Sequence, residues 1–203
     1  MSLFKRLFKT NYKSDEKAKK AKESDHGKYF PEKKAPIDEK FTYYFNKNGG
    51  KFLYCENMEE VLEAFDNILL ENDWYEKEAF CFDEKLVSRF DGFNLNFVQD
   101  AKAAFFLSPC EALVSKNGSI LLSSNQVKEK SLKELPSNFI VFATTSQLVE
   151  SISEGLRKIK NQSTNYIPSN ITTIQDFQPE KEKDFMSYGS STKNLYLLLL
   201  EDL

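Results

Sequence analysis

Residues 111–124 read Glu-Ala-Leu-Val-Ser-Lys-Asn-Gly-Ser-Ile-Leu-Leu-Ser-Ser and carry the clearest local signal in the chain. The pair Asn117-Gly118 stands between two apolar runs, and this dipeptide is the preferred two-residue turn of a β-hairpin. We therefore predict a hairpin whose turn is centred on Asn117 and Gly118.

After the hairpin, strand and helix signals alternate. Residues 139–143 form an apolar run that predicts a core strand, and Thr145 or Ser146 is a suitable cap for a following helix. Four aliphatic residues would form the apolar face of that helix: Leu148, Ile152, Leu156 and Ile159. The final run, residues 195–200, is short and unbroken and predicts another buried strand.

Before the hairpin the same alternation holds. Residues 41–45 predict a helix that Gly49-Gly50 ends, residues 51–55 predict a strand, and Asn57 predicts the cap of a helix that ends near Asn72. Residues 79–82 and 105–107 predict two more strands, with a short helix at 84–90 between them. Such alternation predicts an α/β fold in which helices cover both faces of a mainly parallel sheet. Any ligand site is then expected outside the carboxyl ends of the strands.

The chain of 203 residues is long enough for one domain plus extra segments, since a domain holds roughly 150 residues. Residues 1–36 are rich in Lys, Glu, Ser and Asp, and we predict that they form a flexible basic tail. Residues 37–203 then form a single α/β domain. The apolar residues at the start of the tail leave two interpretations open, a disordered start or a short amphipathic helix for a partner or an anionic membrane. These residues are Leu3, Phe4, Leu7 and Phe8.

Charge is unevenly distributed along the chain. Residues 1–40 hold 12 Lys and Arg against 7 Asp and Glu, whereas the remaining residues hold 16 against 24. A globular part with that negative balance repels a phosphate backbone, so we do not expect nucleic-acid binding. No apolar run reaches the roughly 18 residues of a membrane span, so we expect no integral membrane segment and a cytoplasmic location.

Cysteine and histidine usage limits the metal chemistry. Cys55, Cys81 and Cys110 form no C-x-x-C pair, so we expect neither a zinc site nor an iron–sulfur cluster and interpret each as a buried thiol. The one histidine, His26, lies in the predicted tail. This position argues against a histidine-bound metal and against a Ser-His-Asp arrangement.

Several segments, in order, resemble the lactate-utilisation (LUD) domain family. Residues 41–74, which contain Phe-Thr-Tyr-Tyr-Phe-Asn-Lys-Asn-Gly-Gly-Lys-Phe-Leu-Tyr-Cys and an acidic amphipathic segment, resemble the opening of that family. Ser108-Pro109-Cys110-Glu111-Ala112-Leu113-Val114 and Asn117-Gly118-Ser119-Ile120-Leu121-Leu122 resemble its central hairpin. Leu135-Pro136, residues 139–143 and Gln147-Leu148-Val149 follow in the order of the family. The resemblance covers roughly residues 37–203.

The resemblance implies a fold related to sugar-phosphate isomerases, CoA-transferases and formyltetrahydrofolate cyclo-ligases. It also implies a role in bacterial lactate oxidation, in which LUD proteins act beside iron–sulfur oxidoreductase subunits. A short chain without cysteine clusters would be the cluster-free component.

The chain departs from the family pattern at three places. Lys116-Asn117-Gly118-Ser119 stands where the family has an acidic residue followed by Thr-Gly-Thr. Ile167-Pro168-Ser169-Asn170 stands in place of a Gly-Pro-Ser segment, and Tyr188-Gly189-Ser190-Ser191 in place of His-Gly-Pro. These departures indicate a divergent member.

Two loops are candidate sites for a small anionic ligand. Backbone amides, a hydroxyl and an ammonium are available in Lys116, Asn117, Gly118 and Ser119, and again in Gly189, Ser190, Ser191 and Lys193. An ordinary hairpin turn and a plain connection are the alternative interpretations. Glu111 is a candidate general base or nucleophile, and the alternative interpretation is a solvated surface charge. Cys110 is a candidate thiolate, and the alternative interpretation is an inert buried thiol.

Three functions are consistent with the sequence. The first is a LUD-type protein that contributes to lactate or related hydroxy-acid oxidation and binds a small anionic ligand at the strand-end face near Ser119 and Gly189. The second is a noncatalytic interaction module that docks on an iron–sulfur redox partner. The third is a CoA-transferase or isomerase-like enzyme that uses Glu111 or Cys110. The sequence leaves enzymatic activity, the ligand, the cofactor and the oligomeric state open.

Overall fold

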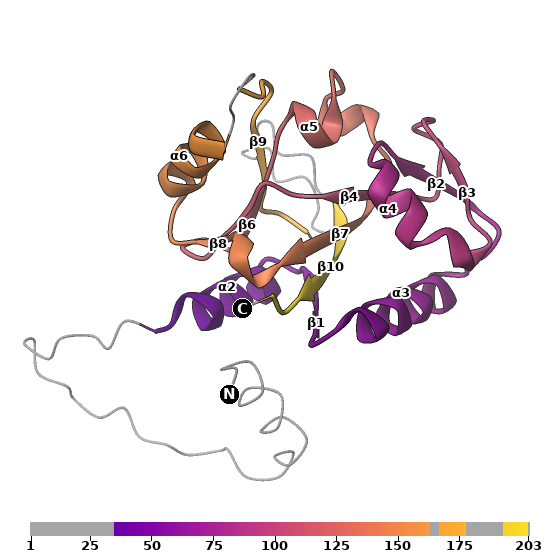
Figure 1. Cartoon of the computed structure of the whole chain (residues 1–203), viewed down its shortest axis with the longest axis horizontal. Helices are drawn as coiled ribbons and strands as arrows, with labels where there is room; N and C mark the ends of the chain where they lie inside the picture. The colour runs from indigo at the N-terminus through magenta and orange to yellow at the C-terminus, as the bar shows by residue number, and fades with distance from the viewer. Residues whose placement is uncertain (1–34, 163–166, 178–192, 203) are drawn as a thin grey trace, which may run out of the picture.

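The computed structural model of the chain describes residues 35–162, 167–177 and 193–202 (Figure 1). Of the predicted tail, only Ala35 and Pro36 fall within these ranges, and its amphipathic start lies outside them. The candidate loop residues Gly189, Ser190 and Ser191 also lie outside the described residues.

Six parallel strands form the main sheet, in the order β1-β10-β7-β4-β2-β3. Their bounds are Lys51–Cys55 for β1, Asn194–Leu200 for β10, Asn138–Thr144 for β7, Phe105–Pro109 for β4, Glu78–Cys81 for β2 and Asn96–Val98 for β3. The structure thus confirms the predicted mainly parallel sheet. β10 lies inside this sheet because its aliphatic side chains are buried on both faces. The edge strand β3 was not predicted, since its three residues are partly exposed and show no clear pattern.

Helices cover both faces of the main sheet, as predicted. α2 (Ile37–Lys47) packs on one face through Phe41 and Phe45, while α3 (Met58–Asn72) and α4 (Glu84–Arg89) pack on the other. In Figure 1, β1 separates α2 from α3. α3 begins where the side chain of Asn57 accepts a hydrogen bond from the backbone N–H of Glu60 at 3.0 Å, which confirms the predicted cap.

The predicted hairpin belongs to a second, smaller sheet. Its order is β8-β5-β6-β9, with bounds Leu148–Val149 for β8, Ala112–Val114 for β5, Ser119–Leu122 for β6 and Thr172–Ile174 for β9. The hairpin pair β5 and β6 is antiparallel, as predicted, but its connection has four residues, 115–118, because Val114 pairs with Ser119. The predicted two-residue turn is therefore wrong. The type I′ turn that Asn-Gly favours needs positive φ angles at both central residues, whereas in this connection only Gly118 has one, at 66°.

The helix for which Thr145 or Ser146 was the predicted cap begins later, at Ile152. Residues Thr145–Gln147 form a single 3₁₀ turn, η3, in which the side chain of Gln147 accepts a hydrogen bond from the backbone N–H of Thr144 at 2.8 Å. Leu148, predicted on the helix, instead extends the chain and pairs with Leu113 in the second sheet. α6 (Ile152–Gln162) then covers the outer face of that sheet.

The remaining short elements are α5 (Ser124–Val127), η1 (Asp91–Phe93) and η2 (Leu132–Glu134). Trp74, the only tryptophan of the sequence, is 8% exposed and stacks on Phe105 with the ring centroids 5.0 Å apart. Its fluorescence therefore reports on the core between α3 and the main sheet. No helix within the described ranges is both long and apolar enough to cross a membrane.

Candidate functional site

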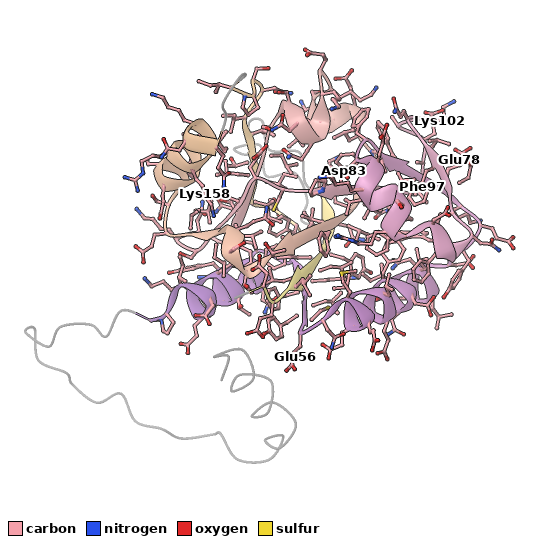
Figure 2. All side chains as sticks on the ribbon, in the orientation of Figure 1. Glu56, Glu78, Asp83, Phe97, Lys102 and Lys158 are labelled. Carbon is pink, nitrogen blue, oxygen red and sulfur yellow. The ribbon has the colours of Figure 1, made fainter. Side chains whose placement is uncertain are left out.

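The order of the strands places a switch point between β2 and β4. From β2 the chain moves outward to β3, whereas from β4 it moves in the opposite direction to β7 and then β10. Open α/β sheets bind ligands outside the carboxyl ends of the strands at such a point. Asp83 follows β2 there, beside α4 in Figure 2, and Cys110 and Glu111 follow β4.

At this switch point, the side chain of Glu111 is held by several hydrogen bonds. Its Oε1 atom accepts three hydrogen bonds, from Ser123 Oγ at 2.6 Å, Asn125 Nδ2 at 2.9 Å and Gln126 Nε2 at 3.0 Å. Its Oε2 atom accepts none from the part of the chain that the structure describes. The half-buried carboxylate is therefore oriented by one oxygen while the other keeps its capacity to accept a hydrogen bond.

The three partners of Glu111 come from the start of α5. Ser123 caps this helix, and its Oγ accepts from the backbone N–H of Asn125 at 3.1 Å. Gln126 completes the capping box because its Oε1 accepts from the backbone N–H of Ser123 at 2.8 Å. The same side chains that begin α5 thus fix the carboxylate.

A second segment, far away in sequence, meets the same helix. The backbone N–H of Ser124 donates to the carbonyl of Ser169 at 2.9 Å, and the backbone N–H of Ser169 donates to Ser124 Oγ at 3.0 Å. Asn170 Nδ2 donates to the carbonyl of Lys128 at 3.4 Å. Ser169 and Asn170, in the segment Ile167-Pro168-Ser169-Asn170, therefore lie against the helix that orients Glu111.

Two lysines after α5 lie beside β2. The ammonium of Lys128 lies 5.9 Å from the centre of the Phe82 ring, and that of Lys130 lies 5.9 Å from the centre of the Phe80 ring. Neither lysine forms an ion pair with a carboxylate among the described residues. The backbone of Lys128 has a φ of 54°, a strained value for a residue with a side chain. The switch point is therefore framed by a carboxylate after β4 and by cations beside β2.

A different cluster occupies the carboxyl ends of β7 and β10. Asp202 accepts hydrogen bonds from Thr145 Oγ1 and from the backbone N–H of Ser146, both at 2.8 Å, and from Ser146 Oγ at 2.7 Å. Partial burial acts to raise the pKa of Asp202, but these hydrogen bonds together lower it to about 2. Lys158, labelled in Figure 2, donates to the carbonyl of Ser146 at 2.5 Å. The hydroxyl groups of Thr145 and Ser146 are therefore used within the cluster, because they donate to Asp202.

The predicted ligand loop at residues 116–119 is packed against α2. A Cβ added to Gly118 would lie 2.3 Å from the backbone nitrogen of Phe45. The hydroxyl of Ser119 is buried and donates to Asn117 Oδ1 at 2.8 Å, and the carbonyl of Asn117 accepts from Asn48 Nδ2 at 2.7 Å. Lys116 is exposed. The polar groups of this turn are thus largely used within the fold.

Lys193 lies at the opposite end of the main sheet from Glu111, just before β10. It is 4% exposed, and its ammonium donates to the carbonyls of Leu135 at 3.0 Å and Pro136 at 2.8 Å. Burial lowers the pKa of Lys193 to about 8. This lysine therefore ties the loop before β7 to the start of β10.

The segment Gln175–Asp176 connects Lys193 with the hairpin turn. The backbone N–H of Lys193 donates to the carbonyl of Asp176 at 3.3 Å, and Asn117 Nδ2 donates to Gln175 Oε1 at 3.0 Å. The structure thus brings described members of the two predicted ligand loops to one region, on the amino side of the main sheet. The ligand-binding role of these residues stays a prediction.

The three cysteines are free and buried, as predicted. Burial raises the pKa of Cys55 to about 12 and that of Cys81 to about 11, and it also raises the pKa of Cys110. The thiol of Cys110 is therefore protonated and enclosed, and Glu111 is the better candidate for chemistry at the end of β4. Among the residues described, no three His, Cys, Asp or Glu side chains gather as a metal-binding group.

The partners of Glu111 are candidate functional residues that were not predicted from the sequence. A signal for them exists, because Ser123-x-x-Gln126 has the spacing of a capping box and predicts a helix start directly after the hairpin. That Glu111 accepts from this box depends on the hairpin, which brings the start of β5 beside the end of β6.

Comparisons with known proteins agree with this fold. The structure is similar to the crystal structure of a DUF162 family protein from Deinococcus radiodurans, with a TM-score of 0.55 and 13% sequence identity over 82% of this chain and 96% of that chain. No curated protein is significantly similar in sequence. A LUD domain matches residues 73–200, which is more than half of the chain. The chain therefore belongs to the LUD domain family, which is associated with lactate utilisation.

Proposed function

We propose that this protein contributes to the oxidation of lactate or a related hydroxy acid by binding a small hydroxy- or oxo-carboxylate beside Glu111. The observation that carries the proposal is the state of the Glu111 carboxylate. One oxygen is held by three donors, and the other accepts no hydrogen bond from the described residues. This arrangement lies at the switch point of the main sheet, where a ligand is expected.

The charges around the switch point fit such a ligand. Glu111 Oε2 accepts a hydrogen bond from the hydroxyl of a hydroxy acid, and a charged acceptor makes this bond stronger than a neutral one. Lys128 and Lys130 attract the ligand carboxylate. Oxidation of the hydroxy acid releases two electrons and two protons; an iron–sulfur partner would accept the electrons and solvent the protons, in keeping with the resemblance to LUD proteins that act beside such subunits.

The proposal is tested by calorimetric titration of the full chain with L-lactate and with pyruvate. We expect Glu111→Gln to weaken lactate binding about tenfold, because a hydrogen bond to a charged group is worth ~1.5–3 kcal/mol. A double substitution, Lys128→Ala with Lys130→Ala, is expected to weaken the binding of both lactate and pyruvate. Glu129→Gln and Lys133→Ala change exposed charges nearby and serve as matched controls.

Two results would contradict the proposal. One is the absence of binding by either acid to the wild-type chain. The other is an unchanged affinity in Glu111→Gln together with a loss of binding in Ser119→Ala, which would move the site to the hairpin turn on the amino side.

The Oε2 atom of Glu111, which accepts no hydrogen bond from the described residues, also favours acyl transfer as a second candidate function. A carboxylate with an unbonded oxygen can attack the carbonyl carbon of an acyl-CoA, forming an anhydride and releasing the CoA thiolate. Mass spectrometry of the chain after incubation with acetyl-CoA tests this candidate. An adduct that disappears in Glu111→Gln but persists in Cys110→Ala supports it, and the absence of any adduct rejects it.

A further inference from the structure

We propose that Gln147 is a positioning residue that fixes the backbone from which Glu111 projects. The inference rests on the proposed function only for the identity of the ligand. The motif Gln147-Leu148-Val149 is part of the resemblance to LUD proteins.

Gln147 connects the carboxyl ends of two neighbouring strands. Its Oε1 accepts from the backbone N–H of Thr144 at the end of β7 at 2.8 Å, and its Nε2 donates to the carbonyl of Cys110 just after β4 at 2.5 Å. The pairing of β4 with β7 ends at Pro109 and Phe142. The amide of Gln147 thus continues the connection between the strands beyond their last backbone pair.

The bond to Cys110 acts directly on Glu111, because both belong to one peptide unit. The carbonyl of Cys110 and the N–H of Glu111 lie in the same rigid plane. Gln147 holds the carbonyl, while the N–H of Glu111 donates to the carbonyl of Leu121 in β6 at 2.9 Å. With both ends of the plane held, the position of the Glu111 Cα, from which its side chain projects, is set.

The turn that carries Gln147 is itself anchored. Thr145 and Ser146, its two preceding residues, donate to Asp202 after β10. Side-chain hydrogen bonds therefore run across the carboxyl edge of the main sheet from Asp202 through the turn to Cys110, and end at the peptide unit of Glu111.

The substitution Gln147→Glu isolates the bond of interest. The new side chain has the same shape and still accepts from the N–H of Thr144, but it cannot donate to the carbonyl of Cys110 when ionised. Glu134→Gln is the matched control, since Glu134 Oε2 accepts from the backbone N–H of Ser131 at 2.9 Å in the equivalent cap of η2. Both variants exchange an amide and a carboxylate in the same type of cap, and only one of these caps is joined to Glu111.

Three quantities are measured on the full chain: the carbonyl carbon shift of Cys110, the amide hydrogen exchange of Glu111 without ligand, and the affinity for L-lactate. In Gln147→Glu we expect the carbonyl resonance to move upfield, the exchange to become about tenfold faster and the affinity to fall about tenfold. Glu134→Gln is expected to leave the carbonyl shift and the amide exchange unchanged, and it serves as the control for these two quantities alone, because Glu134 interacts electrostatically with Lys130. A purely structural role for Gln147 would lower the stability of Gln147→Glu but leave the lactate affinity of the folded protein unchanged.

Wild-type values of the carbonyl shift and of the exchange rate in Gln147→Glu would overturn the inference. An unchanged lactate affinity despite an altered carbonyl shift would overturn it as well. If the shift and the exchange change as expected but the wild-type chain binds no carboxylate, the positioning of Glu111 is supported and the proposed function alone fails.

Discussion

Glu111 and Lys193 are both ionisable residues predicted to act in a site, and the fold uses them in opposite ways. Lys193 lies at the amino end of the main sheet, buried between two backbone carbonyls and 5.0 Å from the centre of the Phe139 ring. Glu111 lies at the carboxyl end, half-buried, with one oxygen that the described residues leave without a hydrogen bond. A charged residue near a strand end thus has its hydrogen-bonding capacity used within the fold when it is enclosed, as in Lys193, and can serve a ligand when part of it stays available, as in Glu111.

The largest effect is expected at the amino side, in the hairpin turn. Gly118→Ala places a side chain on a backbone with positive φ and within 2.3 Å of the backbone of α2, so we expect unfolding to become easier by about 4 kcal/mol. Gly92→Ala is the control, since no heavy atom lies within 4 Å of its added Cβ. Denaturant unfolding followed by Trp74 fluorescence measures both variants. Equal stabilities would show that the turn is not packed on α2.

The lowered pKa of Lys193 predicts that the free energy of unfolding rises with pH. Its ordinary pKa of 10.5 is lowered to about 8 by burial, so between these pH values the unfolded chain holds a proton that the folded chain has lost. The free energy of unfolding should therefore increase from pH 8 toward pH 10.5, by at most about 3 kcal/mol. Lys193→Met lacks this contribution and serves as the reference in the same fluorescence assay. Parallel pH profiles of the two proteins would contradict an enclosed ammonium.

Asp202 contributes a smaller pH-dependent effect at the carboxyl side, where the fold stabilises the charged form of the side chain. Its pKa of about 2 lies below the ordinary 3.8, so its contribution is present above pH 3.8 and is lost as the pH falls toward 2. Because Asp202 is exposed, we expect only about 1 kcal/mol. Asp202→Asn should be less stable than the wild type at pH 7, and the difference should vanish near pH 2. A stability difference between the two proteins that stays constant across this pH range would show that the hydroxyl groups of the η3 turn do not stabilise the charge of Asp202.

Local signals were sufficient for most of the main sheet. Asn57 and the apolar spacing after it locate α3, and the unbroken aliphatic run at the end of the chain locates β10, because cap chemistry and burial on two faces leave a direct pattern in sequence. The start of α6 could not be located in this way. Thr144 and Gln147 do form a cap, but Leu148 gains a partner in β5 and leaves the helical path.

The candidate site was predictable only in part. Glu111 could be named from its place after an apolar strand, but its orientation depends on Ser123, Asn125 and Gln126, which the hairpin brings beside it. The enclosure of Lys193 by Leu135 and Pro136 likewise joins residues far apart in sequence. Local composition carries no information on such contacts, which arise only when distant strands pair.

The most direct test of the contrast between the two ends is a titration of the isotope-labelled chain with L-lactate, followed residue by residue in ¹⁵N–¹H spectra. We predict saturable shifts at Glu111, at residues 123–126 and at Lys128, with the amides of residues 116–119 and Lys193 unaffected. Saturable shifts confined to residues 116–119 and Lys193 would place the ligand at the amino side and contradict the account.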